Sequence, residues 1–95
     1  MRRQGDLLII KVGEIPQGAV RVQSRVLAEG EATGHRHELN SGEVFEKDGV
    51  LYFRVEKDQA ILSHPEHHPL VFTPGEYKVV RQREYKPDGW HYVSD

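Results

Sequence analysis

EVFEKDGVLYFRV, residues 43–55, is the stretch of sequence that decides the fold. Asp48-Gly49 lies at its centre between two runs of valine and aromatic residues, a pattern typical of a two-residue type I′ hairpin turn. Because a loop of this length fixes the register of the strands on either side, the cross-strand pairs can be predicted. They are Lys47 with Val50, Glu46 with Leu51, Phe45 with Tyr52, and Val44 with Phe53.

Alternation along this hairpin predicts one core face and one outer face. Side chains two positions apart on a strand point to the same side of a sheet. The residues expected in the core are Val44, Leu51, Phe53 and Val55. Phe45 and Tyr52 then form an aromatic pair on the opposite side, which is either a binding or dimer surface or an ordinary cross-strand pair under a neighbouring loop.

Further short strands are predicted on both sides of the hairpin. They cover residues 6–12, 19–27, 29–39, 59–63, 70–72 and 77–85, and residues 86–95 can supply one more. Pro65 and Pro69 predict that residues 63–69 form a loop without regular pairing. No segment has an apolar period of 3.6 over three turns, so we expect little or no helix. The predicted fold class is all-β, a small antiparallel barrel or sandwich of about seven or eight short strands.

The composition is that of an ordinary soluble globular protein. A length of 95 residues predicts a single β domain over residues 1–95. With 37% hydrophobic residues, 29% charged residues and a net charge of -2, the chain is not a disordered tail. The apolar run at residues 7–10 is too short for a signal-peptide core, so we expect a cytoplasmic protein that does not enter a membrane.

Histidine gives the main indication of function. Five of the six histidines form two clusters, His35 with His37, and His64 with His67 and His68. On a strand, His35 and His37 would point to one side about 6.5 to 7 Å apart, a spacing that can chelate a metal. The chain has no cysteine, so its metal ligands would be imidazoles and carboxylates.

We therefore predict a mononuclear metal site at these clusters. His35 and His37 would be joined by ligands from the segment between the two prolines, namely His64, His67 and either Glu66 or His68. Such a set suits Zn²⁺, Fe²⁺, Mn²⁺ or Ni²⁺, and the sequence does not choose among them. The sequence also leaves open whether the protein is an enzyme, and hydrogen-bonded structural histidines are the alternative interpretation.

Two other functional classes fit parts of the sequence. The protein could be an assembly module that contacts its own copy or another protein through edge strands and exposed aromatic residues. The residues of that surface would be Phe45, Tyr52, Trp90 and Tyr92. It could instead bind RNA through Arg81, Gln82, Arg83 and Tyr85. A pI of about 6.3 argues against nucleic acid, which ranks last.

Two resemblances add to this picture. The order Gly30, His35, His37, Glu43, Gly49 is similar to the first metal motif of cupins, although each interval around the histidines differs by about one residue and the second cupin motif has no counterpart. Over nearly the whole chain, four phrases resemble those of small bacterial proteins of unknown function. These phrases are residues 5–10, 30–37, 64–70 and 74–85, and they imply a bacterial or phage source.

Overall fold

The protein is an all-β sandwich of two antiparallel sheets. The computed structural model describes residues 1–30, 33–86 and 89–92, with side chains described up to residue 82. The larger sheet has six strands, in the order β1 (Arg2–Gln4), β2 (Leu7–Val12), β10 (Gly75–Arg81), β7 (Val50–Val55), β6 (Glu43–Lys47) and β3 (Val20–Val22). The smaller sheet has four, in the order β4 (Val26–Glu29), β5 (Arg36–Leu39), β8 (Ala60–His64) and β9 (His67–Phe72).

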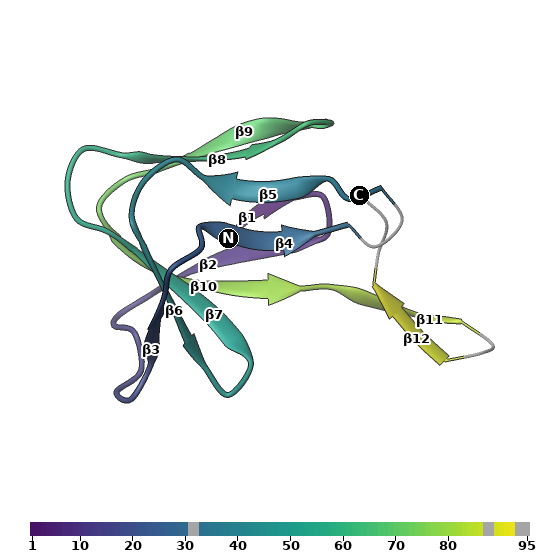
Figure 1. The fold of residues 1–95 in the computed structure, drawn as a ribbon, viewed down its shortest axis with the longest axis horizontal. Coiled ribbons are helices and arrows are strands. Elements are labelled where there is room, and N and C mark those ends of the chain that lie inside the picture. Colours follow the sequence, from purple (N-terminus) through teal and green to yellow (C-terminus); the bar gives the residue numbers. More distant parts are fainter. Residues whose placement is uncertain (31–32, 87–88, 93–95) are drawn as a thin grey trace.

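The remaining two strands, β11 (Arg83–Lys86) and β12 (Gly89–Tyr92), pair only with each other. Figure 1 shows the four-stranded sheet lying over the six-stranded one. The described part of the chain contains no helix, as predicted. The all-β class is confirmed, and of the two predicted architectures the chain adopts the sandwich rather than a closed barrel, with more and shorter strands than the seven or eight expected.

The central hairpin has the predicted register. Strands β6 and β7 pair Lys47 with Val50 and continue in step to Val44 with Phe53. Asp48 and Gly49 have φ angles of 51° and 78°, the two positive values that a type I′ turn requires. The predicted core residues Val44, Phe53 and Val55 are buried, and Leu51 packs against them.

Aromatic rings connect the two sheets within the core. Phe53 and Tyr77 come from neighbouring strands of the larger sheet and stack with ring centroids 4.9 Å apart. Phe72 from β9 meets both rings edge-on, at 5.3 Å from Phe53 and 5.1 Å from Tyr77. The Tyr77 hydroxyl donates a hydrogen bond of 2.7 Å to the carbonyl of Thr73, so its polar end is satisfied.

The histidine-rich segment is a hairpin, and the prediction of an unpaired loop over residues 63–69 was wrong. Strand β8 continues to His64 and β9 begins at His67, leaving Pro65 and Glu66 as a two-residue turn. Pro69 is tolerated inside β9 because β9 is the edge strand of its sheet, where a missing N–H is not needed. Within residues 29–39, predicted as a strand broken at Gly30 and Gly34, residues 36–39 form β5 and Glu29 is the last residue of β4.

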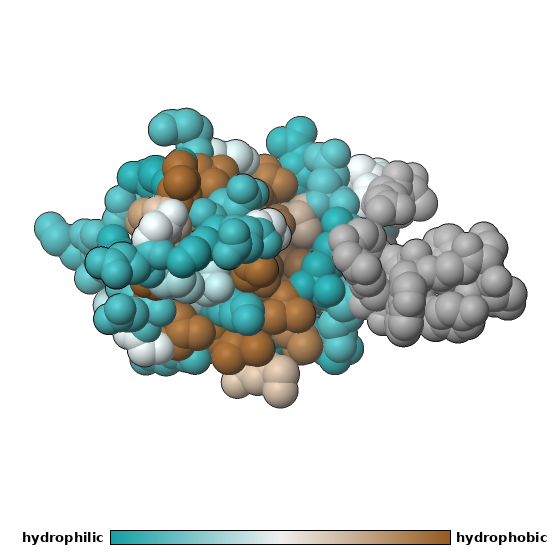
Figure 2. Space-filling model, turned by 90° about the horizontal axis from the view of Figure 1, so that it is seen from below, coloured by the Kyte–Doolittle hydropathy of each residue, from teal (hydrophilic) through white to brown (hydrophobic). Residues whose placement is uncertain are grey.

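The outward face of the larger sheet mixes aromatic and charged side chains. Phe45 and Tyr52 are paired there and half-buried, and the Arg54 guanidinium lies 5.0 Å from the centroid of the Phe45 ring. Arg54 also pairs with Glu43 and Glu76, at 3.8 and 3.0 Å. Viewed from below, apolar patches are interrupted by hydrophilic side chains (Figure 2). No helix long and apolar enough to cross a membrane occurs among the residues that the structure describes.

Gly42 is required where the chain enters β6. Its φ angle is +97°, and a Cβ atom at this position would lie 2.9 Å from the Arg54 carbonyl oxygen. We expect Gly42→Ala to destabilise the protein by about 1–3 kcal/mol, through backbone strain and this contact. Urea unfolding monitored by circular dichroism measures the loss. Gly13→Ala is the control, because a Cβ at Gly13 meets nothing within 4 Å; an equal loss in both variants would contradict the explanation.

Glu76 should make stability depend on pH. Its carboxylate accepts a hydrogen bond of 2.5 Å from the Ile15 N–H and another of 3.0 Å from Arg54 Nε. The Ile15 N–H, helped by Arg54, lowers the pKa of Glu76 below its ordinary value of 4.5, against the opposing effect of burial. A carboxyl with a lower pKa in the folded state stabilises that state at neutral pH, and the benefit is lost as pH falls through the folded pKa.

We therefore expect Glu76→Gln to lower the free energy of unfolding at pH 7 by about 1 kcal/mol. The difference from the wild type should shrink in the acid range below pH 4.5, where the wild-type carboxylate becomes protonated. Urea unfolding at a series of pH values tests this. A difference that is the same at pH 7 and at pH 3 would show that the charge of Glu76 is not responsible.

Candidate metal centre

Four histidines from three segments of the chain meet at one end of the sandwich. His37 lies in β5, His64 ends β8, His67 begins β9, and His35 lies immediately before β5. The His64 ring centroid is 4.3 Å from that of His37, 4.5 Å from that of His67 and 5.5 Å from that of His35. His37 and His67 are stacked at 6.3 Å. The two sequence clusters therefore converge, as the metal-site prediction requires.

Strand pairing explains the convergence. His64 and His67 are directly opposite each other across the β8–β9 turn. Strands β5 and β8 pair Glu38 with Ser63, and continuing that antiparallel register brings His37 opposite His64. Directly opposite residues of neighbouring strands project from the same side of the sheet. Three imidazoles thus form a row across three adjacent strands.

His37 is held by a buried glutamine from the first strand. The amide nitrogen of Gln4 donates to the carbonyls of Leu62 and His68, at 2.8 and 2.9 Å. Its amide oxygen therefore faces His37 Nδ1, 2.8 Å away. Since that oxygen can only accept, His37 Nδ1 carries a proton and donates it. Both side chains are almost fully buried, so this hydrogen bond is shielded from solvent.

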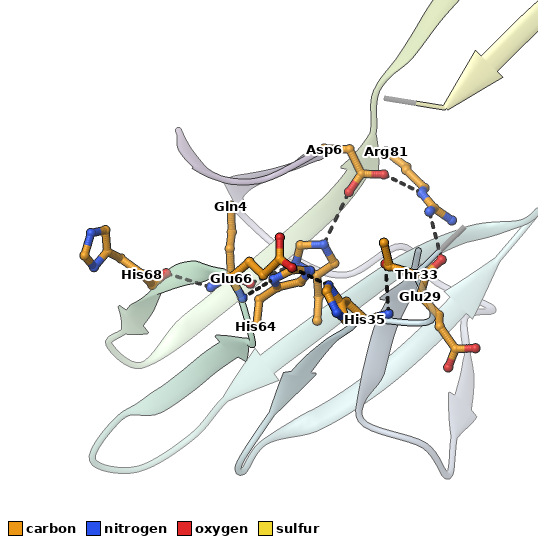
Figure 3. Close-up of polar contacts among 10 residues, drawn as sticks. Gln4, Asp6, Glu29, Thr33, His35, His64, Glu66, His68 and Arg81 are labelled. Carbon is orange, nitrogen blue, oxygen red and sulfur yellow. Dashed lines mark hydrogen bonds and ion pairs between the residues drawn. The ribbon is translucent and has the colours of Figure 1, made fainter. Parts of the chain in front are cut away.

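The other nitrogen of His37 faces a buried carboxylate. His37 Nε2 is 3.3 Å from Asp6 Oδ1, and the side chains of both residues are completely buried. Arg81 Nε holds the second oxygen of Asp6 at 2.6 Å, and Arg81 Nη2 donates to the Glu29 carbonyl at 2.9 Å. Figure 3 shows Asp6 between Arg81 and the histidine rings. The ion pair with Arg81 offsets the cost of burying the Asp6 charge.

The remaining imidazoles are closer to the surface. His64 Nδ1 accepts a hydrogen bond of 3.0 Å from the Glu66 N–H, so in the neutral ring its proton is on Nε2. His35 Nδ1 lies 3.5 Å from a Glu66 carboxylate oxygen. His67 Nε2 is buried and has no hydrogen-bond partner within the described residues, which leaves that nitrogen available to a ligand.

Solvent reaches this end of the molecule through an open recess of about 480 Å³. Its walls include His35 and His64 together with the exposed side chains of Arg36, Glu38 and Ser63 on the outer side of β5 and β8. Figure 3 shows Glu66 turned toward His35, whereas His68 points away from the group. A small ion or molecule entering the recess would meet His35 and His64 first.

Not all of the predicted site residues are brought together. His68 is exposed and contributes only its backbone carbonyl, and Phe45 and Tyr52 lie on the outward face of the larger sheet. Arg81, predicted for RNA, contacts Asp6 and Glu29. The side chains of Arg83, Tyr85 and Trp90 lie outside the described part of the structure.

Sequence reasoning missed Gln4 and Asp6. Gly5-Asp6 forms the two-residue turn between β1 and β2, where Gln4 pairs with Leu7. Gly5 has a φ of 57° and Asp6 a negative φ, the pattern of a type II′ turn with glycine first. The Gly-Asp pair between a polar run and an apolar run was the available signal for this hairpin.

As it stands, the arrangement is not a closed metal site. No group of three or more histidine, aspartate or glutamate side chains among the described residues has its donor atoms arranged around one point. Neighbouring ring centroids are 4.3 and 4.5 Å apart, and His64 Nδ1 is engaged by the Glu66 N–H, so a shared ion would require the rings to rotate and His64 to be released.

Comparison with known proteins identifies a family. A family model described as a domain of unknown function, DUF8820, matches residues 3–82. The match covers most of the chain, so the protein belongs to the DUF8820 family, whose description assigns no function. The matched region contains Gln4, Asp6, the four converging histidines and Arg81. No curated protein and no solved structure matches the sequence.

Gln4 should be essential to the order of the histidine group. Gln4→Leu would leave two buried carbonyls and His37 Nδ1 without their partner, so we expect a loss of about 2–4 kcal/mol in the free energy of unfolding. Urea unfolding measures it. Gln59→Leu, at an exposed position, is the matched control and should change stability little. Equal effects of the two substitutions would contradict the role of Gln4.

Proposed function

We propose that the protein binds one divalent transition-metal ion per chain through His35, His37, His64 and His67. The observation that supports this most is the row of imidazoles on three adjacent strands, with neighbouring ring centroids 4.3 and 4.5 Å apart. Histidines are costly to bury together, because each has to satisfy two ring nitrogens. A shared metal ion would satisfy several of them at once.

The surroundings of the rings support the proposal further. His37 donates from Nδ1 to Gln4, and histidines that bind metals usually donate their second ring N–H to such an acceptor. His67 Nε2 is buried and makes no hydrogen bond to any described group. Donor sets rich in imidazole favour Zn²⁺, Ni²⁺ and Fe²⁺ over Mn²⁺, which prefers oxygen ligands. We therefore expect Zn²⁺, Ni²⁺ or Fe²⁺ to be the ion.

A bacterial source and a cytoplasmic location are part of the same proposal. The resemblance of residues 30–37 and 64–70 to small bacterial proteins supports a bacterial source, and we propose the cytoplasm as the compartment. Whether the bound metal is catalytic or structural depends on whether one coordination position stays open to the recess beside His35 and His64.

Metal binding can be measured on protein made without a histidine tag. After removal of metals with a chelator, titration calorimetry with ZnCl₂ and NiCl₂ should give about one ion per chain. His67→Ala should weaken metal binding at least about 100-fold. Loss of a group that only supports a metal ligand already costs up to about 100-fold, and His67 is proposed as a ligand itself. His67 is only half-buried, so this variant is expected to stay folded.

His68→Ala is the matched control for that variant. It removes an adjacent histidine of the same hairpin whose side chain is exposed and turned away from the other rings (Figure 3). Its affinity for metal should equal that of the wild type. Absence of stoichiometric binding to the wild type, or equal loss in the two variants, would overturn the proposed function.

A further inference from the structure

We propose that a second recess, beside the first residues of β6, binds a small phosphate monoester through its phosphate group. This basic recess has a volume of about 310 Å³ and lies where the chain enters β6 and leaves β7. It shares no lining residue with the recess beside His35 and His64. The inference therefore goes beyond metal binding and does not depend on it.

Positive charge predominates in the walls of the basic recess. Four cationic and two acidic side chains line it, so their net charge is +2, whereas the whole chain has a net charge of -2. A local excess of positive charge in a hollow attracts anions and repels metal cations. The charged lining residues are Arg21, Arg25, Arg54, Lys57, Glu43 and Glu56.

The acidic side chains neutralise only part of this charge. Glu43 pairs with Arg21 at 2.8 Å and with Arg54 at 3.8 Å. Glu76, which does not line the recess, binds Arg54 at 3.0 Å. Glu56 is exposed and forms no ion pair with a described residue. Arg21 and Arg54 therefore already have carboxylate partners.

Arg25 and Lys57 are the cations that remain for a ligand. Neither forms an ion pair within the part of the chain that the structure describes. Arg25 Nε donates a hydrogen bond of 3.1 Å to the Gly42 carbonyl, and the Arg25 carbonyl accepts one of 3.0 Å from the Leu39 N–H. The bond to Gly42 fixes the plane of the guanidinium. Its two terminal Nη groups make no hydrogen bond to a described residue.

The backbone at Gly42 gives Arg25 a fixed anchor. Gly42 has a φ angle of +97° and packs so closely against the Arg54 carbonyl oxygen that a Cβ atom would lie 2.9 Å from it. The acceptor of the Arg25 hydrogen bond therefore has little freedom to move. A guanidinium that is positioned before the anion arrives loses less conformational entropy on binding.

Phosphate fits these groups better than carboxylate does. A phosphate monoester carries a charge of about −1.5 to −2 at pH 7 and has three acceptor oxygens, whereas a carboxylate has a single charge and two oxygens. The phosphate charge is close to the opposite of the net charge of the lining. The planar fork of a guanidinium matches phosphate oxygens, and a lysine adds a point charge beside them.

The size of the recess and the charge of the chain favour a small ligand. A volume of about 310 Å³ is at the lower end of the range for small-molecule sites. Nucleic acid, a polyanion, normally binds to proteins with an extended positive surface, and a chain with a net charge of -2 lacks one.

Binding can be followed by nitrogen-15 NMR on the full-length, metal-free protein in a buffer without phosphate. Phenyl phosphate is the probe, and sodium chloride at the same ionic strength is the control. The Gly42 amide and the Arg25 Nε–H signals should move and saturate at millimolar concentrations of phenyl phosphate or below. Shifts that do not saturate, or that sodium chloride reproduces, would overturn the inference.

Substitution of Arg25 tests its role directly. Arg25→Gln changes an exposed side chain, so the variant is expected to stay folded. It should bind phenyl phosphate at least about 10-fold more weakly, because charged hydrogen bonds are lost. Arg3→Gln is the matched control, since Arg3 is an exposed arginine of β1 that does not line the recess. An equal loss of affinity in the two variants would contradict the role of Arg25.

Two further ligands test the class of anion. Benzoate has the same ring with a carboxylate and should bind more weakly than phenyl phosphate. A short single-stranded RNA without a terminal phosphate offers only diesters and should also bind more weakly. Equal or tighter binding of either one would overturn the assignment to a phosphate monoester. Because the protein is free of metal in every arm, these results are separate from those that test the histidine site.

Discussion

The cost of burying polar groups determines how this sandwich is built at one end. The buried polar and charged side chains within the described part of the chain are Gln4, Asp6, His37 and His64. Instead of being scattered through the core, Gln4, Asp6 and His37 are bonded to one another in a single group. Gln4 is central to it, because its amide reaches β8 and β9 of one sheet from β1 of the other. If the amide were displaced, several buried groups would lose partners together.

Local features of the sequence predicted the local parts of the fold well. The β6–β7 register followed from Asp48-Gly49 because a type I′ turn leaves no freedom in the pairing on either side. We expected His37 and His64 to lie together because both are potential metal ligands, and not because a pairing of their strands was predicted. The pairing of β5 with β8, which makes the two residues neighbours, connects segments 25 positions apart and has no signature in the sequence.

The errors share a physical origin. Pro65 and Pro69 suggested a loop, but one occupies a turn and the other an edge strand, the two places in a sheet where proline has little cost. Gln4 and Asp6 were missed because their importance lies in side-chain contacts with residues 31 to 75 positions away. The sequence alone does not distinguish a buried polar residue in a short terminal strand from an exposed one. The histidines of the candidate site could therefore be predicted, whereas Gln4 and Asp6 could not.

The contacts made by β1 also affect how the molecule meets other chains. Strand β9 forms the border of the smaller sheet, and such a border normally offers free carbonyl and amide groups to an incoming strand. Here Arg2 donates a hydrogen bond to the carbonyl of Val71, and Gln4 donates one to the carbonyl of His68. Pro69 has no amide hydrogen to donate. The same side chains that join the layers thus block this border against edge-to-edge aggregation. The protein can display a hairpin rich in histidine without that strand becoming a template for polymerisation.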